Sequence, residues 1–103
     1  MKFQTHNQKE INFIGTGYIT EINISYKEIK NTFGKSFENG YKVDAMWVIE
    51  FEDGTIATIY NYKNGKNYMG KSGTPKTKIN EWNIGGFRNT NALELVKSAL
   101  GLE

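Results

Sequence analysis

The strongest constraint on the fold is an alternating run of residues that ends in a tight-turn signal. From residue 43 to residue 51, every second side chain is apolar, so one face of an extended strand is apolar throughout. That face carries Val43, Ala45, Trp47, Ile49 and Phe51. Asp53-Gly54 follows and favours a two-residue hairpin turn, and residues 55–62 are rich in β-branched and aromatic side chains. The sequence therefore predicts an antiparallel hairpin whose Trp47 face lies in the core.

The chain upstream of this hairpin carries weaker strand signals. Residues 18–24 alternate and predict a half-buried strand, and residues 10–14 predict an earlier strand joined to it by a turn at 15–17. Residues 1–9 show no pattern, and we expect them to fray.

A helix start is marked clearly between the first strands and the hairpin. Ser25 and Glu28 have the spacing of a capping box, in which Ser25 covers the amide of Glu28 and Glu28 reaches back to Ser25. The helix is expected to run to about Phe33 and to end at Gly34.

The C-terminal part predicts one more strand and one more helix. Residues 79–84 are expected to form a short last strand, which Gly85-Gly86 breaks. Asn91 is placed to cap a final amphipathic helix, and Gly101 ends it.

The order of these elements predicts an α+β fold. We expect a small antiparallel sheet of four to five strands with two helices packed on one face. A chain of 103 residues is long enough for one modest core, so residues 1–103 are expected to form a single domain. The sequence has no cysteine and no apolar run long enough to span a membrane, which predicts a cytoplasmic protein.

Positive charge is concentrated on one predicted loop, residues 63–78, for which the sequence shows no periodicity. Residues 55–80 hold five lysines and no acid, so the 13 basic residues minus these five leave 8 against 11 acids elsewhere. The lysines are Lys63, Lys66, Lys71, Lys76 and Lys78, and the tyrosines beside them are Tyr60, Tyr62 and Tyr68. Rings that stack on bases and ammonium groups that meet phosphates are what a nucleotide or a single-stranded nucleic acid requires. The loop therefore favours an anionic partner, and an ordinary solvated loop is the alternative.

Residues 65–72 match the phosphate-loop pattern G-x-x-x-x-G-K-S. That motif requires a helix directly after it, whose N-terminus holds the phosphates. Gly73-Thr74-Pro75 does not begin such a helix, so the match is interpreted as coincidence.

A second candidate anion site lies where the last strand meets the last helix. Gly85 and Gly86 allow close approach of a ligand to free backbone amides, and Arg88 adds a positive charge nearby. The alternative is a tight turn that requires glycine. Trp82, just before, is a candidate stacking surface, although a core position fits it better.

Catalysis has little support in the sequence. The only histidine is His6, and neither a cysteine nucleophile nor a second histidine for a metal site is present. We therefore expect a protein without enzymatic activity, without a metal and without a cofactor, with a hydrolase as the remote alternative.

Two stretches resemble a group of short, functionally uncharacterised phage-encoded proteins. The first is FEDGTIATIYNYK over residues 51–63, and the second is WNIGG over residues 82–86. An upstream pattern, made of Tyr26, Ile29, Phe33 and Gly34, belongs to the same resemblance. The likeness covers about residues 18 to 100 and implies a phage setting, hence the cytoplasm of a host cell, but no particular mechanism.

These observations together predict a non-enzymatic phage accessory protein that binds an anionic ligand. The leading hypothesis is that it sequesters a nucleotide-derived host immune signal and forms a homo-oligomer, because a small domain gains a concave site most easily between subunits. The alternatives are a protein-binding inhibitor of a host defence enzyme and a weak nucleic-acid-binding protein.

Overall fold

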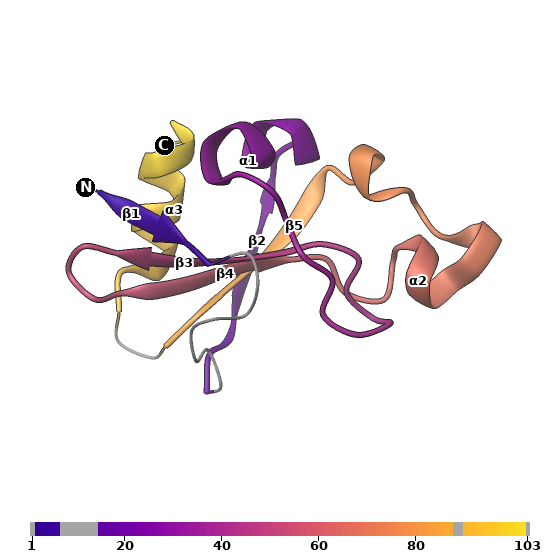
Figure 1. Cartoon of the computed structure of the whole chain (residues 1–103), viewed down its shortest axis with the longest axis horizontal. Helices are drawn as coiled ribbons and strands as arrows, with labels where there is room; N and C mark the ends of the chain where they lie inside the picture. The colour runs from indigo at the N-terminus through magenta and orange to yellow at the C-terminus, as the bar shows by residue number, and fades with distance from the viewer. Residues whose placement is uncertain (1, 7–14, 88–89, 103) are drawn as a thin grey trace.

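The computed structural model describes residues 2–6, 15–87 and 90–102. The described residues form one five-stranded antiparallel sheet with the strand order β1-β3-β4-β5-β2 (Figure 1). The strands are β1 (Phe3–Thr5), β2 (Gly17–Asn23), β3 (Met46–Phe51), β4 (Ile56–Tyr60) and β5 (Glu81–Gly86), and the helices are α1 (Tyr26–Phe33), α2 (Lys66–Met69) and α3 (Ala92–Leu100). The predicted α+β class is confirmed, whereas the strand predicted over residues 10–14 lies outside the described residues.

The predicted hairpin is the β3–β4 pair. Trp47 lies opposite Ile59 in the antiparallel register, and Gly54 has a φ of 90° in the connecting turn. The amide of Thr55 donates to the side chain of Asp53 at 2.9 Å and thereby lowers the pKa of the Asp53 carboxyl. The turn lies where predicted, but only Gly54 takes a positive φ, and the connection spans residues 52–55 instead of two residues.

Helix α1 begins at the predicted cap. The Ser25 hydroxyl accepts a hydrogen bond from the amide of Glu28 at 3.1 Å. The Glu28 carboxylate accepts from the Ser25 hydroxyl at 3.0 Å instead of from the Ser25 amide, so the second half of the capping box is replaced by a side-chain contact. Gly34, with a φ of 86°, follows the helix as predicted.

The N-terminal segment was expected to fray, and for the residues described there this is wrong. Strand β1 pairs with β3, with Phe3 opposite Phe51. The Phe3 ring centroid lies 5.0 Å from that of Phe33 and 6.0 Å from that of Phe51. His6 continues the attachment through its Nε2, which is 3.0 Å from a carboxylate oxygen of Glu50. Three strand residues are too few to show periodicity, so only these distant partners reveal β1.

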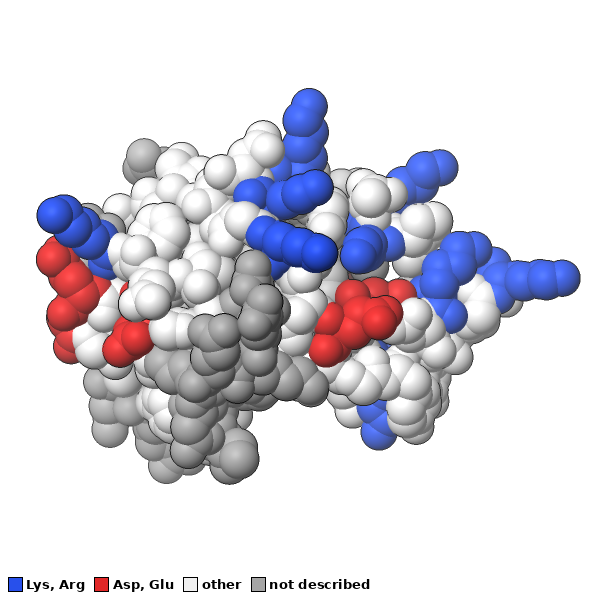
Figure 2. Space-filling model, in the orientation of Figure 1, with Lys and Arg blue, Asp and Glu red and all other residues white. Residues whose placement is uncertain are grey.

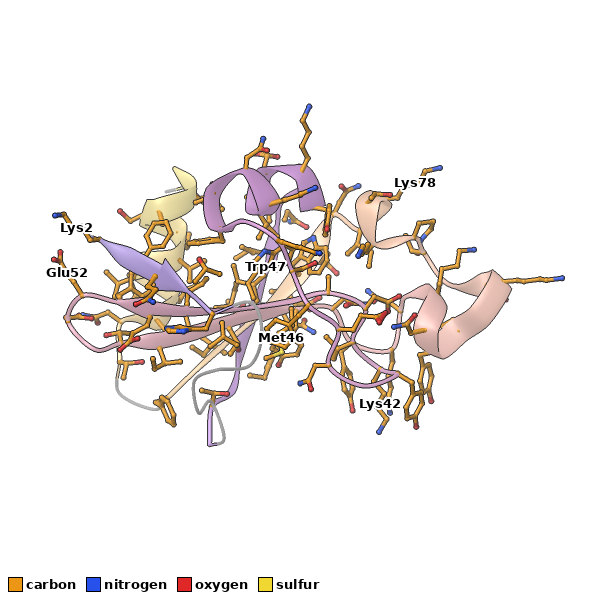
Figure 3. The ribbon with its side chains drawn as sticks, in the orientation of Figure 1. Lys2, Lys42, Met46, Trp47, Glu52 and Lys78 are labelled. Atoms are coloured by element: carbon orange, nitrogen blue, oxygen red, sulfur yellow. The ribbon has the colours of Figure 1, made fainter. Side chains whose placement is uncertain are left out.

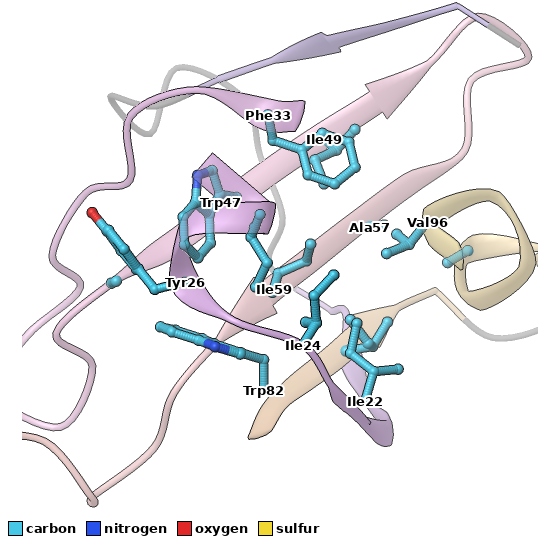
Figure 4. Close-up of a cluster of buried hydrophobic side chains, with 14 of the residues drawn as sticks. Ile22, Ile24, Tyr26, Phe33, Trp47, Ile49, Ala57, Ile59, Trp82 and Val96 are labelled. Carbon is cyan, nitrogen blue, oxygen red and sulfur yellow. The ribbon is translucent and has the colours of Figure 1, made fainter. Parts of the chain in front are cut away.

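Helices α1 and α3 cover one face of the sheet, and the main core lies between (Figures 1 and 4). Its centre is aromatic: the Trp47 and Trp82 rings meet edge to face at 5.4 Å, and the Tyr26 ring lies 5.6 Å from Trp47. Both indole N–H groups are satisfied, because Trp47 donates to the Gly34 carbonyl at 2.7 Å and Trp82 to the Ile79 carbonyl at 3.1 Å. The placement of two helices on one face is as predicted.

The opposite face of the sheet carries a smaller apolar cluster. Its buried members are Val43, Met46, Val48 and Ile56, against which Phe37, Tyr60 and Phe87 pack. Within the described part of the chain, no helix is both long and apolar enough to cross a membrane.

Candidate functional site

The basic loop is built of short helical turns. The loop predicted over residues 63–78 contains α2 and two 3-10 turns, Gly70–Ser72 and Lys76–Lys78, which the sequence did not reveal. The amide of Thr74 donates to the carbonyl of Asn64 at 2.9 Å, and this bond brings the two arms of the loop together. Gly73 lies so close to the backbone of Gly65 that no side chain would fit between them. Within the residues 65–72 that match the phosphate loop, a helix begins at Lys66 and no α-helix follows Ser72 directly, as expected of a coincidental match.

A buried polar network holds this loop to the hairpin. Asn61 is only 1% exposed, and its side-chain oxygen accepts from the amides of Asp44 and Ala45 at 2.9 and 3.0 Å. Its amide nitrogen donates to Asp44 at 3.1 Å and to Asn64 at 3.0 Å. The second carboxylate oxygen of Asp44 accepts from the backbone amide of Asn67 at 3.1 Å. All four bonding positions of Asn61 are therefore used, and the loop is fixed at its base.

Acidic groups also lie against the loop, although none occurs within its sequence. Asp44 is buried directly beneath Gly65, where a Cβ atom would collide with the carboxylate. Glu38 accepts a hydrogen bond from the Asn67 side chain at 2.8 Å. The base of the loop is thus partly neutralised, and its positive character lies on the outward-pointing lysines.

The loop and the chain before β3 form an exposed group of three tyrosines and two lysines, which we term the tyrosine–lysine cluster. Its members are Tyr41, Lys42, Tyr62, Lys63 and Tyr68. The Tyr41 and Tyr68 rings stack at 5.5 Å with an interplanar angle of 17°. The Lys63 ammonium lies 5.2 Å from the Tyr62 ring centroid and 5.6 Å from that of Tyr68. The amide of Lys63 donates to the carbonyl of Lys42 at 2.8 Å, which places the two lysine backbones side by side.

A small cleft of about 230 Å³ adjoins the cluster on the sheet face opposite α1 and α3. Its lining includes Val43, Met46, Thr58, Tyr60 and Tyr62. Burial raises the pKa of Tyr60, and the nearby hydroxyls of Tyr18 and Tyr62 raise it further, so Tyr60 is a neutral hydrogen-bonding group at neutral pH. Tyr62 belongs to both features, because it borders the cleft and lies beneath Lys63.

The remaining loop lysines do not join this cluster. The Lys66 ammonium donates to the carbonyl of Lys71 at 3.4 Å. Lys76 lies 5.8 Å from the ring centroid of Tyr26, the first residue of α1, and Lys78 is exposed on the same 3-10 turn. Figure 3 shows Lys42 and Lys78 on opposite sides of the loop. The predicted single lysine site is therefore divided between two surfaces.

The second predicted anion site is not formed as expected. Trp82 is fully buried in the core, and Gly85 and Gly86 lie inside β5, paired on one side with β4 and on the other with β2. The glycines serve packing: a Cβ on Gly85 would lie 2.5 Å from the Thr58 hydroxyl, and one on Gly86 would lie 2.7 Å from the Cβ of Ala92. The prediction that they break the strand is wrong, and their backbone is occupied by neighbouring strands. Arg88 lies outside the described residues.

Helix α3 also begins differently from the expectation. Asn91 precedes α3, but its side chain makes no capping hydrogen bond. The amide cradle proposed from the sequence at this helix start therefore lacks both its glycines and its cap.

Four residues that shape the candidate site were missed from the sequence. Tyr41 and Lys42 stand some twenty positions before the loop and have no local pattern that points to it. Asp44 occupies a position that an alternating strand pattern assigns to the polar side, whereas Asn61 is a polar residue that continues the apolar face of Ala57 and Ile59. A usable signal existed at Asn61, since an asparagine at the end of an apolar strand often hydrogen-bonds to nearby backbone.

The cluster and the cleft bring together different kinds of side chain. Over the described residues, no group of three metal-ligating side chains comes together. What the cluster and cleft combine is an apolar recess, exposed aromatic rings and two ammonium groups. Compared with protein-family models and with curated proteins, the sequence matches none.

Proposed function

We propose that this protein is a non-enzymatic phage accessory protein that captures a nucleotide-derived anionic ligand and so sequesters a host immune signal. The observation that carries the proposal is the double role of Tyr62, which borders the apolar cleft and lies 5.2 Å beneath the Lys63 ammonium. The phage setting rests on the sequence resemblance alone.

The chemistry of a nucleotide fits the two halves of this site. A base is flat and aromatic, so it can stack on Tyr62 at the mouth of the cleft, where Val43 and Met46 supply apolar walls. Its phosphates then fall near Lys63 and Lys42, whose ammonium groups have no carboxylate partner among the described residues. The raised pKa of Tyr60 keeps its hydroxyl protonated and able to donate to a base or sugar oxygen.

A second copy of the chain completes the proposed site. Small-molecule sites usually bury about 70–90% of the ligand surface, and a cleft of about 230 Å³ open to solvent does not reach this alone. A homodimer that apposes two clefts would supply the missing wall. Light scattering coupled to size exclusion, with and without ligand, measures this directly.

Calorimetry with a panel of cyclic oligonucleotides and ADP-ribose derivatives tests the binding proposal. We expect Lys63→Gln to weaken binding by about tenfold or more, because a charge-assisted hydrogen bond contributes about 1.5–3 kcal/mol. Lys97→Gln, a lysine on α3, is the matched control and should bind as the unaltered protein does. The absence of heat with every member of the panel would sink the proposal.

The fate of the ligand separates capture from hydrolysis. After incubation with the protein and denaturation, mass spectrometry should recover the ligand with its mass unchanged. A product of altered mass would identify the protein as a hydrolase.

A protein-binding inhibitor of a host defence enzyme is the second candidate, and a specific observation favours it. Tyr41, Tyr68 and Met69 are 61%, 40% and 47% exposed and lie on or next to the cluster. Exposed tyrosine and methionine are enriched at protein interfaces. Pull-down of one stoichiometric host protein that is lost in Tyr41→Ser, with no small molecule bound, would favour this reading.

A further inference from the structure

A second charged surface lies over α1, on the side of the basic loop away from the tyrosine–lysine cluster. It consists of Lys27, Lys30, Lys35, Lys76 and Lys78, which we term the lysine face. Figure 2 shows basic side chains gathered over α1 and the basic loop, with one acidic patch beside the loop and another at the far end of the molecule. The first three of these lysines lie outside the basic loop of the sequence.

Contacts around Tyr26 bring the three lysine-bearing segments together. The Lys76 ammonium lies 5.8 Å from the centroid of the Tyr26 ring. The Tyr26 hydroxyl is 3.4 Å from the hydroxyl of Ser36, the neighbour of Lys35. Lys27 and Lys30 stand one helical turn apart on α1, so their side chains share one side of the helix. Five lysines from three stretches of sequence thus form one surface.

This surface is not neutralised within the protein. Among the described residues, the one ion pair joins His6 and Glu50, so none of the five ammonium groups is paired with a carboxylate. The nearest acid in sequence is Glu28, whose carboxylate accepts a hydrogen bond from the Ser25 hydroxyl. The backbone amide of Glu28 donates to the same hydroxyl. The face therefore presents several positive charges toward solvent.

We propose that the lysine face binds the phosphate backbone of a nucleic-acid duplex without reading its sequence. The partner is a duplex because single strands are held by exposed rings on which bases stack, and no exposed aromatic side chain is found on α1 or the Lys76–Lys78 turn as described. Tyr26 is buried there, with Lys76 over its ring. Charge without stacking or groove-reading side chains gives backbone contact only. The proposal uses none of the residues assigned to the nucleotide site, so either can fail alone.

Five phosphate contacts set the expected salt dependence. The logarithm of the association constant for a B-form duplex should fall linearly with the logarithm of the salt concentration. The slope should be no steeper than about −4.5, since each of the five contacts contributes about −0.9. Binding is therefore weak and is measurable near 50 mM salt, falling steeply toward about 200 mM.

Fluorescence anisotropy with a labelled mixed-sequence duplex of about two helical turns provides the test. In Lys27→Gln/Lys30→Gln we expect the slope to become shallower by about 1.8 and the affinity to fall by on the order of ten- to a hundredfold. Lys2→Gln/Lys97→Gln removes the same charge, again with one lysine in the last turn of a helix, and should change neither quantity.

Three results would overturn the proposal. One is equal weakening by the two double variants, which would indicate a response to net charge alone. Another is tighter binding of a single strand of the same length that is lost in Tyr62→Leu, which would move the partner to the tyrosine–lysine cluster. The third is no measurable duplex binding near 50 mM salt by protein that circular dichroism shows to be folded.

Discussion

At the scale of single residues, Gly85 shows how a sequence feature that suggests a ligand can serve packing. It sits in β5 between β4 and β2, where a Cβ atom would lie 2.5 Å from the buried Thr58 hydroxyl and 3.1 Å from the Gly17 carbonyl oxygen. Neither neighbour is the free end of a flexible side chain. We expect Gly85→Ala to lower the free energy of unfolding by about 1–3 kcal/mol, measured by chemical denaturation.

Gly17→Ala is the matched control for this prediction. Gly17 lies in the adjacent strand, its φ is not positive, and a Cβ there meets no atom within 4 Å. It should change the stability by no more than about 0.5 kcal/mol. Equal effects of the two substitutions would contradict a packing role for Gly85.

Glu21 carries a second prediction at this scale, because it faces another carboxylate. A hydrogen bond with Glu81 and the charge of that group raise the pKa of Glu21 above its usual 4.5. The folded state therefore holds this proton more tightly than the unfolded state, so its contribution to stability is complete below pH 4.5 and is lost as the pH rises through the raised pKa. Glu21→Gln should raise the melting temperature at about pH 7 and have little effect at about pH 4.

Glu81→Gln tests the same pair from the other side. It should reproduce the pH dependence of Glu21→Gln, and the double variant should gain little more, because either substitution removes the repulsion. A gain that does not depend on pH would contradict the shared-proton explanation.

At the scale of elements, the basic loop depends on Asn61. Its side chain makes four hydrogen bonds in a buried position, two of them to backbone amides that have no other acceptor assigned. Asn61→Ala leaves these groups unsatisfied and should lower the free energy of unfolding by at most about 1–3 kcal/mol for each unsatisfied group. Trypsin should also cleave faster within residues 63–78. Asn67→Ala keeps the backbone bond to Asp44 and should leave both stability and cleavage nearly unchanged.

Elements were predictable from the sequence where their signals are local. The Asp53-Gly54 turn, the Ser25 cap and the Gly101 end of α3 are each decided by a few adjacent residues, and each lies where predicted. Strand β1 and the position of Gly85-Gly86 inside β5 depend on partners far along the chain, which no single stretch reveals. The same holds for the candidate site: the sequence pointed to Tyr62, Lys63 and Tyr68, while Tyr41 and Lys42 reach them only through tertiary structure.

At the scale of the whole molecule, two basic surfaces are separated, and only one of them carries exposed tyrosines. The tyrosine–lysine cluster lies on one side of the basic loop, and the lysine face lies over α1 on the other, as Lys42 and Lys78 mark in Figure 3. If both proposals hold, the two ligands occupy different surfaces. A saturating nucleotide should then change the affinity for a duplex by less than about fivefold, the low end of an allosteric coupling.

Competition anisotropy measures this coupling directly. The labelled duplex is bound first, and the tightest nucleotide of the panel is titrated in at constant ionic strength, so that screening does not change. Stoichiometric displacement of the duplex would show that a single surface serves both ligands.

The anchoring of the loop to the hairpin also bears on how the chain reaches this fold. The β3–β4 hairpin has a short turn and can form early, whereas β5 must return to β4 after the whole basic loop. The bonds of Asn61 to Asp44 and Asn64 fix the first arm of the loop, and the bond from Thr74 to Asn64 draws in the second, so less chain remains to be closed before β5 arrives. Strand β2 can pair only after β5 is in place. When the network that positions the lysines forms before β5 pairs, it lowers the entropy cost of completing the sheet.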